Sequence, residues 1–547
     1  MQYEISQEIP TSQFIRIQLQ IACQQDEPIS LQLPAWRPGR YELAHYAQYV
    51  RRISVHVNGE NVPFQKLTKD RWTFRAGKAG DYVVDYEFYA GQMDAGGCWA
   101  DTEQLYVNFS NLAFDIQGRT EEEITISLRV PGHYQVATAL TQTSPFEFWA
   151  SNYQELIDSP FIASPTLKHA TYQVANTLFH LWFQGDIHFD IPALIETFRA
   201  FTARQIDAFG DFPAENYHFL YQLLPYTHFH GVEHKFSTVI TYGSAMLLQD
   251  PTEMAELVGV SSHELYHFWN VCRIRPAAIL PYDLSKEAYL QEGLIAEGVT
   301  TYLGDMYLLR CGAYSMPQYL DELTKRINRE TVSQGWKYQS IADSSFDLWL
   351  DGYKVGIPDK KVSIYNRGAL ISLCLDLILL DRQSSLEDVM KQMWNTYGKT
   401  ETGYTLKDFE SIVSACAGDI PFISAFFQRF IYGTEDLLPV LRECLMWAHI
   451  AIRPDNFPDN LGTYYGIILD DSDKITRLHP DAPAYHKLMR ADLIGKIELT
   501  SNGLKLDVTR GGKSLSISLP KTNRTYFDNY ELVCEEANNP LRDLWMR

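Results

Sequence analysis

The sequence predicts a multidomain α+β protein in which a mainly helical region lies between two regions of β-strands. Apolar and polar residues alternate along roughly the first 165 positions, as in half-buried strands. From about residue 190 the apolar spacing becomes helical, and alternation returns in the last hundred residues. At roughly 150 residues per domain, a chain of 547 residues is long enough for three or four domains.

The composition is that of a folded protein, and its charge excludes some classes of partner. Hydrophobic residues make up 46% and charged residues 21%, which rules out wholesale disorder. The 47 Lys and Arg residues against 68 Asp and Glu residues give a formal net charge of -21. Because neutralising phosphates requires clustered cations, we expect neither a nucleic acid nor an anionic membrane surface as a partner. A diffuse negative field favours a cationic ligand such as a free amino terminus.

No targeting segment is recognisable in the sequence. The first residues carry neither the basic start nor the apolar run of a secretory signal. No stretch of about 18 apolar residues is present, so we expect no membrane span. The eight cysteines are scattered without a C-x-x-C pair, which indicates neither a disulfide framework nor a cysteine-rich zinc site. We therefore expect a cytoplasmic protein with reduced thiols.

Short strands with Gly and Pro punctuation predict a β-sandwich in the N-terminal region. An Asn58-Gly59 pair ends one of these strands and is the strongest short hairpin signal. We expect this domain to be structural, without chemistry of its own. The expected strands are Phe14 to Ala22, Ile29 to Leu33, Ile53 to Val57, Tyr82 to Tyr89 and Ile124 to Val130.

The middle region carries apolar residues at helical spacing, with some strands near its beginning. Asp250 can cap free N–H groups, Pro251 fits a first turn and Glu253 can reach back, so a helix is expected to start there. The expected helices are Ile191 to Phe209, Met254 to Asn270, Ala288 to Leu309, Gly368 to Leu380 and Leu386 to Tyr397. The later strands are expected at Tyr464 to Leu469, Lys505 to Thr509 and Ser514 to Leu519, the last two joined by an Arg510-Gly-Gly512 turn.

The sharpest chemical signal is His263-Glu264-Leu-Tyr-His267. Helical residues four apart differ by about 40° in direction and about 6 Å in height, so both imidazoles project from one face. That spacing lets both bind one Zn²⁺, while Glu264 can take a proton from a water and deliver it to a leaving amine. Two ordinary histidines on a helix surface are the alternative interpretation.

A catalytic zinc site needs a third protein ligand and one open position. The segment 290–305 offers two acidic candidates, Glu292 and Glu297. They lie about 140° apart around a helix, so they cannot both face the metal. Glu297 has Thr301 one turn later, where a hydroxyl could hydrogen-bond a ligand, and this weakly favours Glu297.

The longer stretch from His263 to Pro276 resembles the glycyl aminopeptidase family of gluzincin metallopeptidases. In that family a similar H-E-x-x-H-x-W-N-V-x-R-I-R-P string is followed, about thirty residues on, by E-G-x-T-x-Y. Here Glu297-Gly-Val-Thr-Thr-Tyr302 falls thirty residues after His267. The resemblance implies a thermolysin-like catalytic domain with one Zn²⁺ per chain, held by His263, His267 and Glu297, and Glu264 as general base.

Other segments extend this resemblance over nearly the whole chain. Leu33-Pro-Ala-Trp-Arg-Pro-Gly-Arg-Tyr41 looks like the family's P-x-W-x-P-G-x-Y signature, and Ser345-Phe-Asp-Leu-Trp349 is also similar. Arg273 and Arg275 belong to the family's string, but their roles stay open.

Gly231-Val-Glu233-His234 looks like the family's G-x-E-H segment. Wider gluzincin aminopeptidases place a glutamate from such an edge strand against the substrate's α-ammonium. The resemblance therefore implies that Glu233, with Gly231, binds the free amino terminus and places the first peptide carbonyl at the metal. No acidic partner accompanies His228, His230 and His234 at ligand spacing, so we expect no second metal site there.

Tyr365-Asn-Arg-Gly368 resembles the Y-x-K/R-G element of the wider gluzincin aminopeptidases. Its tyrosine hydrogen-bonds the tetrahedral intermediate, and a phenol donor there stabilises the oxyanion. The resemblance implies this role for Tyr365. An ordinary half-buried aromatic is the alternative.

The family commonly ends with a PDZ-like domain, which the C-terminal region partly resembles. Tyr464-Tyr-Gly-Ile467 resembles the loop that holds a peptide carboxylate, and Ile467 to Leu469 would be the strand that pairs with the peptide. Lys487 and Ala491 stand where glycines are usual, and Tyr464 replaces the first loop glycine. Peptide capture by this module is therefore left open.

Together these features predict a zinc aminopeptidase with a β-sandwich (1–168), a catalytic domain (169–450) and a PDZ-like domain (451–547). Its expected partners are peptide substrates with a free N-terminus, and the resemblance implies small first residues, Gly or Ala. A zinc endopeptidase on the same scaffold and a non-catalytic peptide-binding scaffold are the alternatives. The sequence reveals neither the physiological substrate nor the oligomeric state.

Overall fold

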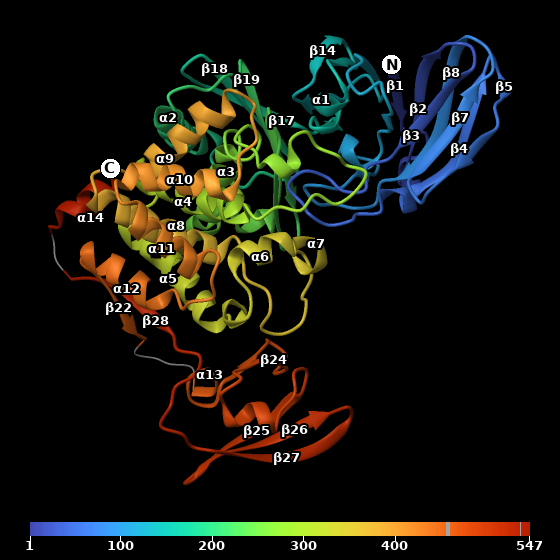
Figure 1. Cartoon of the computed structure of the whole chain (residues 1–547). Helices are drawn as coiled ribbons and strands as arrows, with labels where there is room; N and C mark the ends of the chain where they lie inside the picture. Colours follow the sequence, from blue (N-terminus) through green and yellow to red (C-terminus); the bar gives the residue numbers. More distant parts are fainter. Residues whose placement is uncertain (456–459, 536–537) are drawn as a thin grey trace.

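The computed structural model of the protein describes residues 1–455, 460–535 and 538–547. It contains an N-terminal β-sandwich, a central helical domain and a C-terminal β-rich region (Figure 1). One large hydrophobic core runs through the first two parts, and a separate smaller core belongs to the C-terminal module. The predicted fold class is confirmed. None of the described helices is both long and apolar enough to cross a membrane.

Two sheets pack face to face in the N-terminal domain, as the ring contact between Phe74 and Tyr82 across them illustrates. Alternating burial along their strands matches the alternation in the sequence. The larger sheet has the order β14-β15-β12-β1-β2-β8-β4-β5, with bounds Thr141–Ser144, Glu147–Ala150, Ile124–Arg129, Gln2–Ser6, Phe14–Cys23, Gly80–Tyr89, Val50–Val57 and Glu60–Asn61. The facing sheet has the order β11-β3-β7-β6, with bounds Asp115–Ile116, Glu27–Gln32, Arg71–Ala76 and Phe64–Lys66.

The expected hairpin at Asn58-Gly59 is confirmed: it joins β4 to β5, and both residues have positive φ, 53° and 80°. The helix α1 (Tyr153–Ile157) follows β15. A third sheet connects this domain to the next one, because Tyr106 and Ile162 from its strands share a small core with Leu220 of the catalytic domain. Its order is β13-β16-β10-β9, with bounds Gln135–Thr138, Phe161–Ser164, Leu105–Val107 and Trp99–Ala100.

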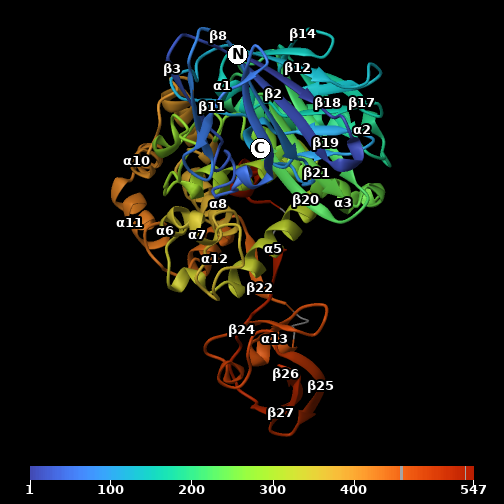
Figure 2. The same cartoon turned by 90° about the vertical axis from the view of Figure 1, so that its right-hand side faces the viewer.

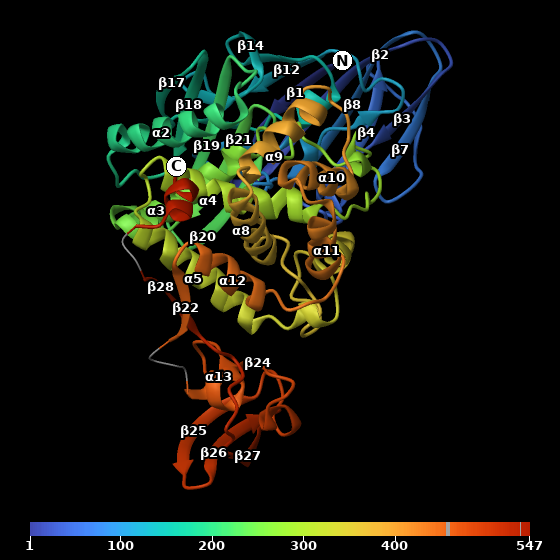
Figure 3. The same ribbon diagram turned by 60° about the vertical axis from the view of Figure 1, so that its left-hand side comes forward.

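The central domain begins with a five-stranded sheet in which β20 is an edge strand. Helix α2 (Ile191–Phe209), which has the predicted bounds, packs Phe198 against Phe219 of the sheet (Figure 3). The order of the sheet is β17-β18-β19-β21-β20, with bounds Lys168–Val174, Thr177–Gln184, Asn216–Leu224, Ser237–Gly243 and His228–Glu233. The edge strand β20 lies beside α3 (Figure 2).

Helices make up the rest of the central domain, and α8 runs through its middle with almost every side chain buried. Asp250 caps α3 through Thr252 N–H, and Pro251 occupies the first turn, as expected. The helices are α3 (Pro251–Tyr266), α4 (Thr300–Arg310), α5 (Met316–Val332), α6 (Ile341–Phe346), α7 (Leu348–Asp351), α8 (Asn366–Asp381), α9 (Leu386–Met393), α10 (Leu406–Ala417), α11 (Ile420–Phe430) and α12 (Leu438–Trp447).

The helix predicted from Ala288 to Leu309 differs in its first half. Residues Leu294–Val299 form a π-helical turn before α4, and residues 288–292 contain no α-helix. Close packing accompanies this geometry: a Cβ at Gly298 would lie 2.6 Å from the backbone of Gly368, at the start of α8. Such π-helical turns are frequent at functional sites.

The C-terminal module contains a three-stranded antiparallel meander, whose last two strands are joined by the predicted turn with positive φ at Gly511 and Gly512. The strand expected from Tyr464 is wrong in its first part, because Tyr464 and Tyr465 lie in a helix and Gly466 N–H donates to Gly462 O. That N–H group is thus not free to bind a peptide carboxylate. The elements are α13 (Asn460–Tyr465), β23 (Ile467–Leu469), β24 (Ile475–Leu478), β25 (Leu493–Thr500), β26 (Gly503–Arg510) and β27 (Lys513–Pro520).

After the module, the chain returns to the central domain (Figure 3). Strand β28 (Tyr530–Cys534) pairs with β22 (Ile450–Pro454), and α14 (Pro540–Trp545) packs on the helices. Trp545 is fully buried, and its indole N–H donates to Tyr302 Oη at 2.7 Å. The limits 1–168, 169–450 and 451–547 stay a prediction, and we propose that α14 belongs with the second domain.

Replacing Trp545 tests the contribution of α14 to the central core. We expect Trp545→Ala to lower the free energy of unfolding of the central domain by about 3–5 kcal/mol, because it removes a fully buried ring. Leu544 lies on the same helix and is 45% exposed, so Leu544→Ala serves as the control. It should change the free energy of unfolding by less than about 0.5 kcal/mol. Urea unfolding followed by circular dichroism measures both. Equal effects would exclude α14 from the core.

Candidate active site

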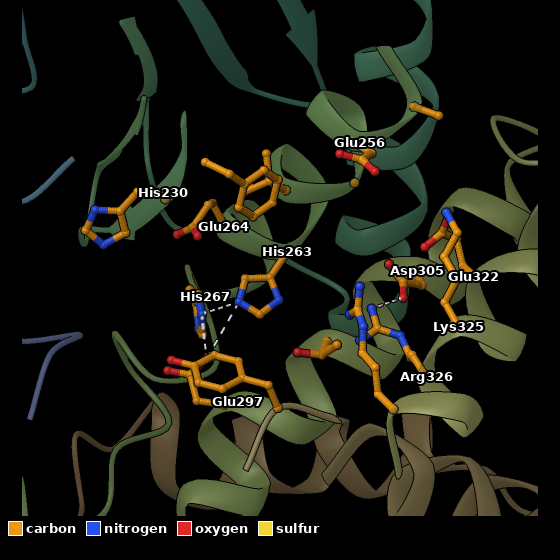
Figure 4. A pocket seen from close by; sticks show the side chains of 18 of the residues that line it. His230, Glu256, His263, Glu264, His267, Glu297, Asp305, Glu322, Lys325 and Arg326 are labelled. Atoms are coloured by element: carbon orange, nitrogen blue, oxygen red, sulfur yellow. Dashed lines mark hydrogen bonds and ion pairs between the residues drawn. The ribbon is translucent and has the colours of Figure 1, made fainter. Parts of the chain in front are cut away.

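Side chains from four segments meet in a cavity of about 1290 Å³ (Figure 4). The segments are α3, the π-helical turn, the edge strand β20 and the residue that precedes α8. The cavity continues from there along α3 toward charged side chains of α5, where Arg326 pairs with Asp305 at 2.7 Å. It therefore has room for more than one amino-acid residue.

His263, His267 and Glu297 bring three donor atoms together. The two Nε2 atoms are 3.0 Å apart, and Glu297 Oε2 lies 3.6 Å from that of His263 and 3.5 Å from that of His267. Ligand atoms of a tetrahedral zinc with Zn–N distances of about 2.0–2.1 Å lie about 3.3 Å apart. The donor types and their separations thus fit a zinc ion with three protein ligands.

The surrounding structure fixes these donors. His267 Nδ1–H donates to Asn270 O at 2.6 Å, so that Nε2 has a lone pair for a metal when the ring is neutral. The Asn270 amide donates to Ile295 O and Thr300 Oγ1, which ties the end of α3 to the segment that carries Glu297. These bonds also accompany the end of α3 at Tyr266 instead of the predicted Asn270.

Glu297 is held as a charged group inside the protein. Burial alone would raise its pKa, but the nearby imidazoles of His267 and His263 lower the pKa to about 2. Its Oε2 atom is buried without a hydrogen-bond partner among the described residues, as expected for an atom whose partner is a metal. Thr301 lines the same cavity, but the described hydrogen bonds contain none from its hydroxyl to Glu297.

Glu264 lies beside the same donor set, with its carboxylate against the edge strand. A Cβ at Gly231 would lie 2.2 Å from Glu264 Oε1, so only glycine leaves room for the carboxylate. Burial, together with the charges of Glu233 and Glu297 and against the opposing effect of His267, raises the pKa of Glu264 to about 8. A carboxyl group in this environment can exchange a proton near neutral pH.

Glu233 ends the edge strand β20 and is only 8% exposed. Its carboxylate, Glu264 and His267 offer atoms within 4.8 Å of one another. Burial raises the pKa of Glu233, so the buried carboxylate lacks full compensation of its charge. A cationic group of a ligand at this position would supply that compensation.

Tyr365 directly precedes α8 and lines the cavity at 37% exposure. Burial raises the pKa of its phenol, and the charge of Glu297 adds to that effect, so the hydroxyl is a donor. The structure thus brings Tyr365, Glu233, Glu264 and the three donor residues to one cavity.

Other residues considered from the sequence serve elsewhere. Glu292 accepts the N–H groups of Gln291 and Leu406 and lies outside the cavity lining. Arg273 donates to the carbonyl oxygens of Lys235 and Phe268, and Arg275 donates to Cys272 O. The two guanidinium groups therefore hold the segment after α3 in place.

The three histidines around Glu233 are spread over different surroundings. His228 and His230 line the cavity, and His230 Nδ1 lies 3.8 Å from Asp94 Oδ1. His234 instead pairs with Asp158, with 3.0 Å between its Nδ1 and Oδ1 of the aspartate. None of these three histidines belongs to a cluster of described side chains that could hold a metal ion.

Gly39, Arg40 and Tyr353 are among the cavity residues that sequence reasoning missed. Gly39 and Arg40 come from the N-terminal domain, which was expected to be structural only, and Tyr353 comes from the loop after α7. The only available signal was the P-x-W-x-P-G-x-Y signature, which contains Gly39. Nothing in the sequence around Tyr353 distinguishes it among the 33 tyrosines of the chain.

Comparisons with known proteins identify related domains and a related structure. The Peptidase M61 N-terminal domain matches residues 2–165, and the M61 glycyl aminopeptidase domain matches residues 256–371, from within α3 into α8. The crystal structure of an aminopeptidase N family protein from Idiomarina loihiensis is 25% identical, with each chain fully covered and a TM-score of 0.89. Among curated proteins there is no match.

More distant structures add nothing to the assignment. An M1 zinc metallopeptidase variant from Deinococcus radiodurans, bound to Tyr-Ser-Ala, is 14% identical over 78% of this chain and 92% of its own. Its TM-score of 0.48 is too low to support an argument. From the domain matches, the chain is a metallopeptidase that carries the N-terminal and catalytic domains of the M61 glycyl aminopeptidase family.

Proposed function

We propose that this protein is a zinc aminopeptidase that removes small N-terminal residues, Gly or Ala, from peptides. One observation carries the proposal: two imidazoles and a carboxylate meet within 3.6 Å in a cavity that also contains Glu264 and Glu233. The domain matches support peptide hydrolysis as the reaction.

His263, His267 and Glu297 would hold one zinc ion per chain. Bound zinc supplies a Lewis acid for the peptide carbonyl and lowers the pKa of a water molecule. Helix α3 and the π-helical turn hold the three side chains, and hydrogen bonds through Asn270 join these two elements. The rest of the chemistry belongs to the other residues of the cavity.

Glu264 acts as the general base and then as the general acid. Its carboxylate accepts a proton from the attacking water and delivers that proton to the leaving nitrogen. The close approach of Gly231 supports this role, because it fixes the carboxylate beside the imidazole of His267. The Tyr365 hydroxyl donates a hydrogen bond to the carbonyl oxygen of the substrate as negative charge develops on that oxygen.

Glu233 binds the substrate's α-ammonium. A buried carboxylate gains strongly from a charge-assisted hydrogen bond to an ammonium group, which distinguishes a free terminus from an internal peptide. Because Glu233 lies beside Glu264, the same bond puts the first peptide group at the reacting residues. This favours an aminopeptidase over an endopeptidase on the same scaffold.

The zinc-ligand assignment predicts a difference between two nearby glutamates. Glu297→Ala should lose most of its zinc on dialysis, because only two protein ligands remain. Glu292→Ala is the control and should keep one zinc ion per chain, since Glu292 caps backbone N–H groups outside the cavity. Metal analysis of the folded, purified variants measures this. Zinc loss in the second variant alone would reverse the assignment.

The role of Glu264 predicts a specific loss of turnover. Glu264→Gln should bind zinc normally but lower kcat by about 10²–10⁴-fold, because the amide accepts no proton. Glu256→Gln, which changes another cavity glutamate of α3, should retain activity close to that of the unaltered protein. Turnover of amino-acid anilides gives the comparison, and similar rates in both variants would contradict the assignment.

The amine-binding role predicts a dependence on the substrate's free terminus. Glu233→Ala should lower kcat/KM for glycine and alanine anilides by about 10–100-fold, the expected loss of one hydrogen bond between charged groups. Hydrolysis of N-acetylated peptides, whatever its initial rate, should change much less. Equal losses on blocked and free substrates would remove Glu233 from the amine site.

A further inference from the structure

The segment Leu33 to Tyr41 leaves the β-sandwich and is anchored on the central domain. The indole N–H of Trp36 donates to Asp283 O at 3.2 Å and to Lys286 O at 2.7 Å. The Trp36 ring also packs edge-on against Trp349, with 5.3 Å between the centroids. These contacts fix the turn that follows, Pro38 to Arg40, at the cavity wall.

At this turn the backbone of Gly39 lies directly against the carboxylate of Glu233. A Cβ at position 39 would lie 2.6 and 2.8 Å from the two carboxylate oxygens, closer than real Cβ contacts. Gly39 also has φ of +77°. Its carbonyl accepts a hydrogen bond from Tyr353 Oη at 3.4 Å, and the Arg40 guanidinium lies 5.1 Å from the Tyr353 ring centroid.

We propose that this turn of the N-terminal domain is part of the substrate site, with Gly39 as a positioning residue for the Glu233 carboxylate. The proposal rests on the proposed function, in which Glu233 binds the α-ammonium. The missing side chain at position 39 gives the carboxylate its space, and the backbone of the turn limits how far the carboxylate can withdraw. The β-sandwich thereby sets the distance between the bound amine and the reacting peptide group.

The contact predicts a local effect of substitution. Glu233 meets the turn with the far end of its side chain, so a methyl group at position 39 displaces the carboxylate and leaves the backbone in place. An alanine at positive φ also carries a backbone cost that has nothing to do with the site. Gly59 isolates that cost, because its φ is +80° and nothing lies within 4 Å of its Cβ position.

The experiment compares Gly39→Ala with Gly59→Ala in the full-length, zinc-loaded protein. Calorimetry measures the binding of glycine hydroxamate and of acetohydroxamate, which differ only in the amine. We expect Gly39→Ala to weaken the amine-bearing ligand about tenfold and the other less than about twofold. Gly59→Ala should change neither, and thermal unfolding should show a similar shift of Tm in both variants.

Equal weakening of both ligands by Gly39→Ala, or no weakening beyond that of Gly59→Ala, would overturn the inference. Glu233→Ala separates this outcome from a failure of the proposed function. If Glu233→Ala does not discriminate between the ligands, the amine site itself is misassigned. If Glu233→Ala discriminates between the two ligands and Gly39→Ala does not, the amine site stands and only the role of the turn is contradicted.

Should Gly39→Ala not fold, Tyr353→Phe replaces it, because it removes the hydroxyl that holds the Gly39 carbonyl without adding volume. It should weaken glycine hydroxamate more than acetohydroxamate. An equal effect on the two ligands would overturn the inference in that case.

Discussion

The site depends on the contact between α3 and the segment that carries Glu297. A buried carboxylate is costly unless cations or hydrogen bonds compensate it, and here two imidazoles lie within 3.6 Å. The Asn270 amide ties the two segments together, and the packing of Gly298 against Gly368 holds the Glu297 turn against α8. The metal-binding geometry is therefore a property of helix packing.

Glycine supplies the space for both remaining carboxylates of the cavity. Gly231 lies against Glu264, and Gly39 lies against Glu233, in each case where a Cβ would collide with the acid. Gly231 belongs to β20, the strand that also carries Glu233, whereas Gly39 belongs to the N-terminal domain. The cavity thus brings together Gly39 and Glu233, which lie almost two hundred positions apart in the sequence.

Local patterns in the sequence predicted the parts of the fold that depend on local interactions. The bounds of α2, the cap at Asp250 and the hairpin at Asn58-Gly59 all follow from neighbouring residues, and each was confirmed. The π-helical turn was missed, because its geometry accompanies packing against α8 seventy residues later. The helix at Tyr464 was missed because a short, continuous apolar run is compatible with either a strand or a helix.

The candidate site divides in the same way. Two histidines four residues apart are readable from the sequence, whereas spacing barely separated Glu297 from Glu292, and the family resemblance decided between them. The contribution of Gly39 and Tyr353 was not readable, because it arises where two domains and a distant loop come together.

The return of the chain after the C-terminal module has a consequence for biosynthesis. Trp545 fills a position next to Tyr302, in the helix that follows the Glu297 turn. On the ribosome, the central domain therefore cannot close its core until translation has passed residue 545, long after its own helices have emerged. A nascent chain that lacks α14 keeps apolar surface exposed, which chaperones and proteases recognise.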